Sequence, residues 1–166
     1  MTDQSNLQNL IIAMRSFPNQ LRAQVHRLHE PELSFRPAPH EWSILENIGH
    51  LIDVDVVMRG RIGKIIAAEN PMLQAMDTEE YVRKANYQQK NAVSLLNSFA
   101  EHRAELIEEL RFLQPAALSR TGTHPTRGAV SIMDIIMLLA RHDETHSQQI
   151  EQTLAAYHSL HDRVID

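Results

Sequence analysis

Residues 131–157 read SIMDIIMLLARHDETHSQQIEQTLAAY, and their apolar side chains recur at intervals of three and four residues. This spacing predicts a long amphipathic helix with one face turned toward a core. Ser131 is the expected N-cap, and Asp134 stands in the capping-box position. His142 and His146 are four residues apart, so their imidazoles project from one face about a turn apart and can grip one metal ion.

The same periodicity predicts three more long helices earlier in the chain, over residues of about 7–28, 43–69 and 77–114. Pro18 lies inside the first helix and should kink it or split it near Phe17, because proline lacks a backbone donor and crowds the preceding turn. The third helix, about 35 residues long, is expected to be the longest element.

Two connections lack helical periodicity and are rich in turn-forming residues, at about 31–42 and 114–130. The first holds three prolines within nine positions, so it cannot be one continuous helix. Ser43 and Glu46 form an expected capping box where it ends. No segment shows convincing strand alternation. We therefore predict an all-α fold, a single-domain four-helix bundle over residues 1–166.

The composition excludes several classes of function. The chain has no cysteine, so disulfides, thiolate ligands and cysteine nucleophiles are absent. A net charge of −5, from 16 basic and 21 acidic residues, argues against a nucleic-acid surface. No apolar run is long enough to span a membrane, and the polar N-terminus does not resemble a secretory signal. A cytoplasmic location, with no membrane and no nucleic-acid partner, is the expectation.

A third metal ligand is available on the second predicted helix, where His50 is the only histidine. Helical arithmetic places it on the flank of the apolar stripe, beside Asn47 and Val54, so the site should lie at a seam between helices and stay open to substrate. The three histidines suit one divalent metal ion, Zn, Ni, Fe or Mn, and leave a coordination position for water or a thiol.

The alternative is that these histidines bind no metal and are half-exposed side chains hydrogen-bonded to neighbouring polar groups. Two histidines at this spacing also occur by chance in a chain with ten. The other seven are predicted to lie on polar faces or in loops. Of these, His40 and His124 fall in the two connections that could border the site and contact substrate.

Three carboxylates near the histidines in sequence are candidates to orient a ligand imidazole or to move a proton: Asp53, Asp143 and Glu46. Asp53 lies one helical turn from His50. We predict Asp53 and Asp143 as the catalytic candidates.

Known catalytic motifs fit poorly. The metalloprotease motif needs glutamate directly after its first histidine, where this chain has Asp143, and the inverted motif needs glutamate before the second, where it has Thr145. No glycine-rich phosphate loop or nucleophile elbow is present.

The chain resembles the DinB-like superfamily of bacterial four-helix bundles, the damage-inducible and metal-dependent hydrolase group. The matching motifs are the stretch 41–51 (EWSILENIGHL) followed by Asp53, the segment 33–37 (LSFRP) before it, and the HDETH of 142–146 followed by Gln149. The resemblance covers essentially the whole chain. It implies a bundle whose metal ligands are His50, His142 and His146.

Members of this superfamily are often homodimers, and those characterised include transferases and isomerases that use low-molecular-weight thiols. The resemblance therefore favours a metal-dependent enzyme that activates such a thiol or water, a thiol S-transferase or a hydrolase, acting on a small molecule. It also implies a homodimer. The alternative is a non-catalytic bundle of the stress response that binds a metal or another ligand.

Overall fold

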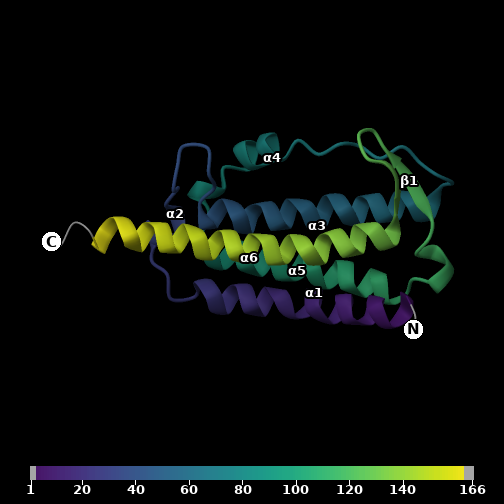
Figure 1. Cartoon of the computed structure of the whole chain (residues 1–166), viewed down its shortest axis with the longest axis horizontal. Helices are drawn as coiled ribbons and strands as arrows, with labels where there is room; N and C mark the ends of the chain where they lie inside the picture. Colours follow the sequence, from purple (N-terminus) through teal and green to yellow (C-terminus); the bar gives the residue numbers. More distant parts are fainter. Residues whose placement is uncertain (1–2, 163–166) are drawn as a thin grey trace.

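The computed structural model describes residues 3–162, and helices dominate it (Figure 1). None of the helices in that range combines the length and the apolar character needed to cross a membrane. The elements in chain order are α1 (Asp3–Val25), α2 (Glu30–Ser34), α3 (Ile44–Ala67), α4 (Thr78–Ala85), the 3-10 turn η1 (Tyr87–Gln89), α5 (Ala92–Arg111), the 3-10 turn η2 (Pro115–Ala117), β1 (Thr121–His124), β2 (Gly128–Ser131) and α6 (Ile132–Asp162).

Four long helices form the bundle that the apolar periodicity predicts. Helices α1 and α3 each pack against both α5 and α6, so α1 and α3 stand at opposite corners. The chain between α3 and α5 runs back along the outside of α3 and carries α4, so α3 and α5 point in the same direction (Figure 1). Helix α6 runs antiparallel to α3 beside it, and this pair holds all three predicted ligands.

The predicted capping residues begin the helices as expected. The Ser43 hydroxyl accepts from the Glu46 backbone N–H while the Glu46 carboxylate accepts from the Ser43 N–H, a complete capping box. At the start of α6, the Asp134 N–H donates to the Ser131 hydroxyl, and the Asp134 carboxylate accepts from the Ser131 N–H. These boxes fix where the two helices of the site begin.

The prediction of a third helix of about 35 residues is wrong, because the helix is interrupted between α4 and α5. Asn86 takes a left-handed conformation with φ of 51° and ends α4. Asn91 then caps a new helix by accepting from the Ser94 N–H. The longest element is α6, with 31 residues.

The two connections also differ from expectation. The short helix α2 overlaps the start of the predicted irregular segment 31–42, with a proline in its first turn where the missing donor costs nothing. Segment 114–130 contains most of a two-stranded antiparallel hairpin, β1–β2, with Gly128 at φ of 74°. Pro18 does not split α1, which stays one helix through it.

The core is divided by a buried polar layer. One apolar cluster includes Phe17, Phe99 and Ile150, and the other includes Met14, Leu106 and Leu139. Each cluster therefore contains residues from α1, α5 and α6.

Arg103 of α5 lies between these clusters, fully buried, with its guanidinium bonded to Asp55 of α3 and Asp143 of α6 at 2.8 Å each. It also donates to the backbone oxygen of Met14 on α1 at 3.1 Å. One side chain thus ties all four bundle helices together at the level where α6 begins to carry the histidines.

Candidate metal centre

The structure brings the three predicted histidines together at the α3–α6 seam. The Nε2 atom of His142 lies 2.9 Å from Nε2 of His50 and 3.0 Å from Nε2 of His146. His50 and His146 are buried, at 4% and 5% exposure, and His142 is half-buried. One ligand atom from each ring lies within 4.8 Å of the others, which is compact enough for a single ion.

Asn47 fixes the orientation of one ring. Its Oδ1 lies 2.7 Å from Nδ1 of His146, while its Nδ2 donates to the backbone oxygen of Ser43. Because an amide oxygen only accepts, Nδ1 of His146 carries the proton, and Nε2 presents a lone pair to the cluster. This is the outer contact by which proteins orient a ligating histidine.

The cluster is not satisfied by hydrogen bonds among the rings alone. Nε2 of His142 carries at most one proton, so it can make a hydrogen bond with only one of its two partners in the neutral state. Burial lowers the pKa of His50 to about 3, of His142 to about 2 and of His146 to about 4, with the neighbouring rings adding to the effect on His50 and His142. The rings are therefore neutral at physiological pH. Three neutral nitrogens that converge on one point fit a divalent cation.

Trp42 covers the cluster from one side. Its ring centroid lies 4.7 Å from that of His50, and it stacks on His146 at 6.2 Å with an angle of 14° between the planes. The indole therefore shields these two imidazoles from water and leaves His142 as the most exposed of the three.

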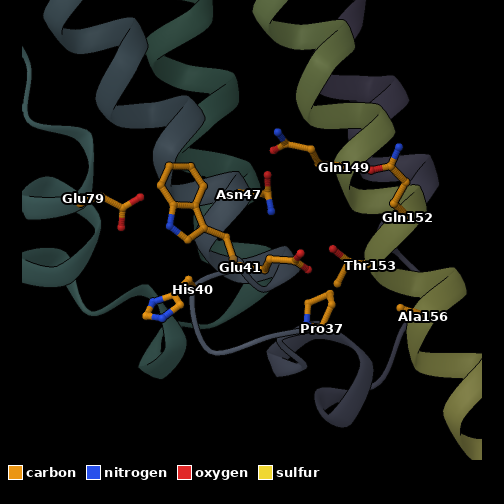
Figure 2. A pocket seen from close by; sticks show the side chains of 10 residues that line it. Pro37, His40, Glu41, Asn47, Glu79, Gln149, Gln152, Thr153 and Ala156 are labelled. Atoms are coloured by element: carbon orange, nitrogen blue, oxygen red, sulfur yellow. The ribbon is translucent and has the colours of Figure 1, made fainter.

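Two pockets flank the covered cluster. One, of about 880 Å³, is lined by His50 and His142 themselves and extends between α3 and α6 toward the hairpin. The other, of about 650 Å³, lies beyond Trp42 and Asn47. Figure 2 shows this second pocket between α6, which supplies Gln149 and Thr153, and the loop that supplies His40. Direct access to the ring nitrogens is through the first pocket.

The candidate carboxylates all have other partners. Asp53 accepts a hydrogen bond from the Tyr87 hydroxyl at 2.7 Å, Asp143 binds Arg103, and Glu46 serves the α3 cap and pairs with Arg36. Among residues 3–162, none of them is hydrogen-bonded to a ring of the cluster. Their proposed roles in catalysis stay predictions without a supporting contact, although the second oxygen of Asp53 is buried and unpartnered.

The register of α6 explains the position of Asp143. The core-facing row of α6 passes through Leu139, Asp143 and His146, so Asp143 rather than His142 is buried at that turn. His142 is displaced toward the seam, where the larger pocket opens. The sequence places His142 and His146 on one helical face, whereas the buried position of that turn belongs to Asp143.

Two residues that shape the site are not predicted from the sequence. Asn47 is expected beside His50 but without a role, and Arg103 is not among the predicted site residues. The signal for Arg103 was available: it falls between Phe99 and Leu106 in the three-and-four spacing of α5, a core position occupied by a charge. A buried arginine requires acidic partners, and Asp143 was the acid nearest to the histidines.

The two histidines of the predicted connections, His40 and His124, line different pockets. His124 is buried in β1 and lines the larger pocket, and His40 is exposed and lines the smaller one.

Comparison with known proteins gives consistent matches over most of the chain. A family model described as the DinB superfamily matches residues 13–150. The protein named "Putative metal-dependent hydrolase OB0782" of Oceanobacillus iheyensis is 28% identical over 137 residues, covering 82% of this chain and 79% of the relative. "Putative metal-dependent hydrolase BH0277" of Halalkalibacterium halodurans is 26% identical over 153 residues, covering 91% and 88%.

Solved structures share the fold. YfiT from Bacillus subtilis, described as a probable metal-dependent hydrolase with an unusual four-helix bundle topology, superposes with a TM-score of 0.86 at 17% identity, covering 92% of this chain and 88% of YfiT. A mycothiol-dependent maleylpyruvate isomerase superposes with a TM-score of 0.69 at 15% identity, covering 87% of this chain and 60% of the isomerase. At these identities the likeness establishes the four-helix bundle fold.

Proposed function

The chain belongs to the DinB superfamily, and on that premise we propose that it is a metal-dependent enzyme whose one divalent ion is held by His50, His142 and His146. The observation that carries the proposal is the convergence of three Nε2 atoms, with contacts of 2.9 and 3.0 Å between neutral rings of which two are buried and one is half-buried. The names of the relatives, metal-dependent hydrolases, support a metal-dependent activity.

A divalent ion at this position would act as a Lewis acid and lower the pKa of a bound water or thiol. The protein's own residues supply the setting. Asn47 holds His146 in the tautomer that offers its Nε2 lone pair, and Trp42 keeps water from the buried side. His142 faces the larger pocket, so a small-molecule substrate would reach the centre from that side.

We propose a low-molecular-weight thiol or water as the activated group. Because the chain has no cysteine, a reacting thiol has to come from outside the protein. The structural likeness to a protein named for its mycothiol dependence is the reason to test a thiol beside water.

The test compares the two chemistries on metal-loaded protein. Zn²⁺-, Ni²⁺- and Mn²⁺-loaded samples are assayed with a small thiol plus chlorodinitrobenzene for thiol transfer, and with nitrophenyl acetate for hydrolysis. We expect metal-dependent turnover in one assay, abolished in His50→Ala and His142→Ala and retained in the control His102→Ala, which changes a partly exposed histidine of α5.

Turnover that survives the loss of His50 would contradict the catalytic proposal. Tight metal binding without turnover in either assay would favour the non-catalytic metal-binding bundle instead.

A further inference from the structure

The larger pocket is an elongated groove with the histidines at one end. His50, Val54, Met58 and Arg61 all line it and follow one another on α3 at spacings of four, four and three residues, so they form one row along the helix. Eleven residues at 1.5 Å rise place Arg61 about 16 Å along the axis from His50. The far end is therefore formed by Arg61 and by the hairpin residues His124 and Arg127.

Positive charge gathers at this far end without compensation. The Arg61 guanidinium donates to the backbone oxygen of Gln74 at 2.6 Å and lies 3.4 Å from Nε2 of His124, and its Nε is buried without a partner. In the described part of the chain, neither Arg61 nor Arg127 has a carboxylate within ion-pair distance. Burial, and then Arg127, lower the pKa of Arg61, so the two cations oppose each other.

The one acid that lines the groove does not relieve this charge. The carboxylate of Asp134 accepts from the N–H and the hydroxyl of Ser131, at 2.9 and 2.6 Å, and so belongs to the cap of α6. Burial, Arg61 and Arg127 lower the pKa of His124, which stays neutral and adds no charge of its own. The far end thus offers guanidinium donors to an anion.

The middle of the groove is apolar and adaptable. Three of the seven methionines line it, Met58 from α3, Met76 from the segment before α4 and Met137 from α6, together with Val54 and Leu138. Methionine side chains adjust to ligands of different shape because they are unbranched and polarizable.

We propose that this groove binds a small amphipathic organic anion, with its carboxylate or phosphate at Arg61 and Arg127 and its apolar body along the methionines. The opposite end of the ligand then lies at the histidines. The inference deepens the proposed function, since it names the substrate class of that site, but anion binding itself does not require the metal.

The test is calorimetric titration of the full-length chain in the presence of a chelator, so that a carboxylate cannot bind through a metal ion. The probes are hexanoate, hexyl phosphate and the uncharged hexanamide at constant ionic strength. We expect hexanoate, hexyl phosphate or both to bind at least about tenfold more tightly than hexanamide, and the better of the two identifies the head group.

Arg61→Gln should lower the affinity for the anion about tenfold or more and leave hexanamide unchanged. Arg127→Gln removes the second positive charge at the far end, in the exposed turn of the hairpin, where the side chain has no packing role. It should lower the affinity for the anion by a smaller factor. The matched control is Arg59→Gln, which removes one charge from the same helix, where the side chain pairs with Glu105 and Glu109 of α5.

Equal affinity for hexanamide and the anions, or anion binding that is unchanged in both Arg61→Gln and Arg127→Gln, would overturn the proposal. A parallel Zn²⁺ titration without chelator keeps the two hypotheses apart. Zn²⁺ binding that survives in Arg61→Gln, with anion binding lost, supports both, whereas absence of Zn²⁺ binding in the wild type counts against the metal site alone.

Discussion

Asn47 orients the His146 ring within the histidine cluster. Its amide oxygen accepts a hydrogen bond from Nδ1–H of His146, so the Nε2 lone pair faces the other rings. We expect Asn47→Ala to weaken Zn²⁺ binding by about 10- to 100-fold, the usual cost of losing an outer contact to a ligand. Competition with a chelating dye measures this.

Two variants make the Asn47 experiment specific. Asn47→Asp keeps an acceptor oxygen and should bind Zn²⁺ far better than Asn47→Ala. Asn97→Ala removes an exposed asparagine of α5 that accepts from Arg22, and it should leave affinity unchanged. Equal losses in all three variants would show that Asn47 has no orienting role.

Because the buried rings are neutral, the stability of the metal-free protein depends on pH. The pKa values of His50 and His146 are lowered by burial to about 3 and about 4, below the value near 6.5 of an unfolded chain. A lowered histidine pKa contributes stability that is present above pH 6.5 and is lost as pH falls toward the folded value.

We therefore expect urea unfolding of the metal-free protein to show stability falling steeply between pH 6.5 and 4. The slope should be smaller in His146→Gln, which has one less buried imidazole to protonate. Stability that stays flat over this interval in the wild type would mean that the rings are solvated.

The residues of the cluster were largely predictable from sequence, because a four-residue spacing on a helix and one histidine on a neighbouring helix are local patterns. The roles of Asn47 and Arg103 depend on partners 99 and 40 residues away. Such pairings are set by how helices pack, which periodicity alone does not specify. Because Asp143 pairs with Arg103, it does not make the expected contact with a histidine ring.

Two glycines of α3 are expected to respond oppositely to substitution by alanine. A Cβ added to Gly49 would lie 2.2 Å from the ring of Tyr87, whereas a Cβ on Gly63 meets nothing within 4 Å. Gly49→Ala should therefore destabilise the protein by about 1–3 kcal/mol through overpacking. Gly63→Ala should stabilise it by about 0.5–1 kcal/mol, because alanine favours the helix.

Thermal unfolding of the two variants, each compared with wild type, tests this contrast. If Gly49→Ala leaves the midpoint unchanged or raises it as Gly63→Ala does, the close approach of η1 to α3 at Gly49 is not present in solution. Because Tyr87 also donates to Asp53, we expect Gly49→Ala to weaken this link between η1 and the helix that carries His50 as well.

Elements with strong local signals were predicted well. The capping boxes at Ser43 and Ser131 marked two helix starts correctly. The break at residues 86–91 was missed because it depends on Asn86 in a left-handed conformation, which sequence permits but does not require. The hairpin was missed because its strands have four residues each and pair only with each other and, through Thr123, with residues next to Met72.

The buried Arg103 layer links all four bundle helices. Removing the arginine would leave Asp55 and Asp143 buried without a counter-charge. We expect Arg103→Met to lower the free energy of unfolding by about 3–5 kcal/mol. Chemical denaturation measures the loss.

The matched control is Arg59→Met, which breaks an ion pair on the surface and should cost about 1 kcal/mol or less. Similar losses for Arg103→Met and Arg59→Met would contradict a buried, dry layer. The bundle itself was predictable as a whole, since four amphipathic stripes have few other ways to bury their apolar faces. That these helices make up one domain over residues 1–166 stays a prediction.

The most direct test of the proposed centre is elemental analysis of protein that has been loaded with Zn²⁺ and dialysed. We expect about one ion per chain in the wild type and in His102→Ala, and strong depletion in His50→Ala, His142→Ala and His146→Ala. Circular dichroism of each variant establishes that it is folded. Folded variants of His142 and His146 that keep the full metal content of the wild type would contradict the three-histidine site.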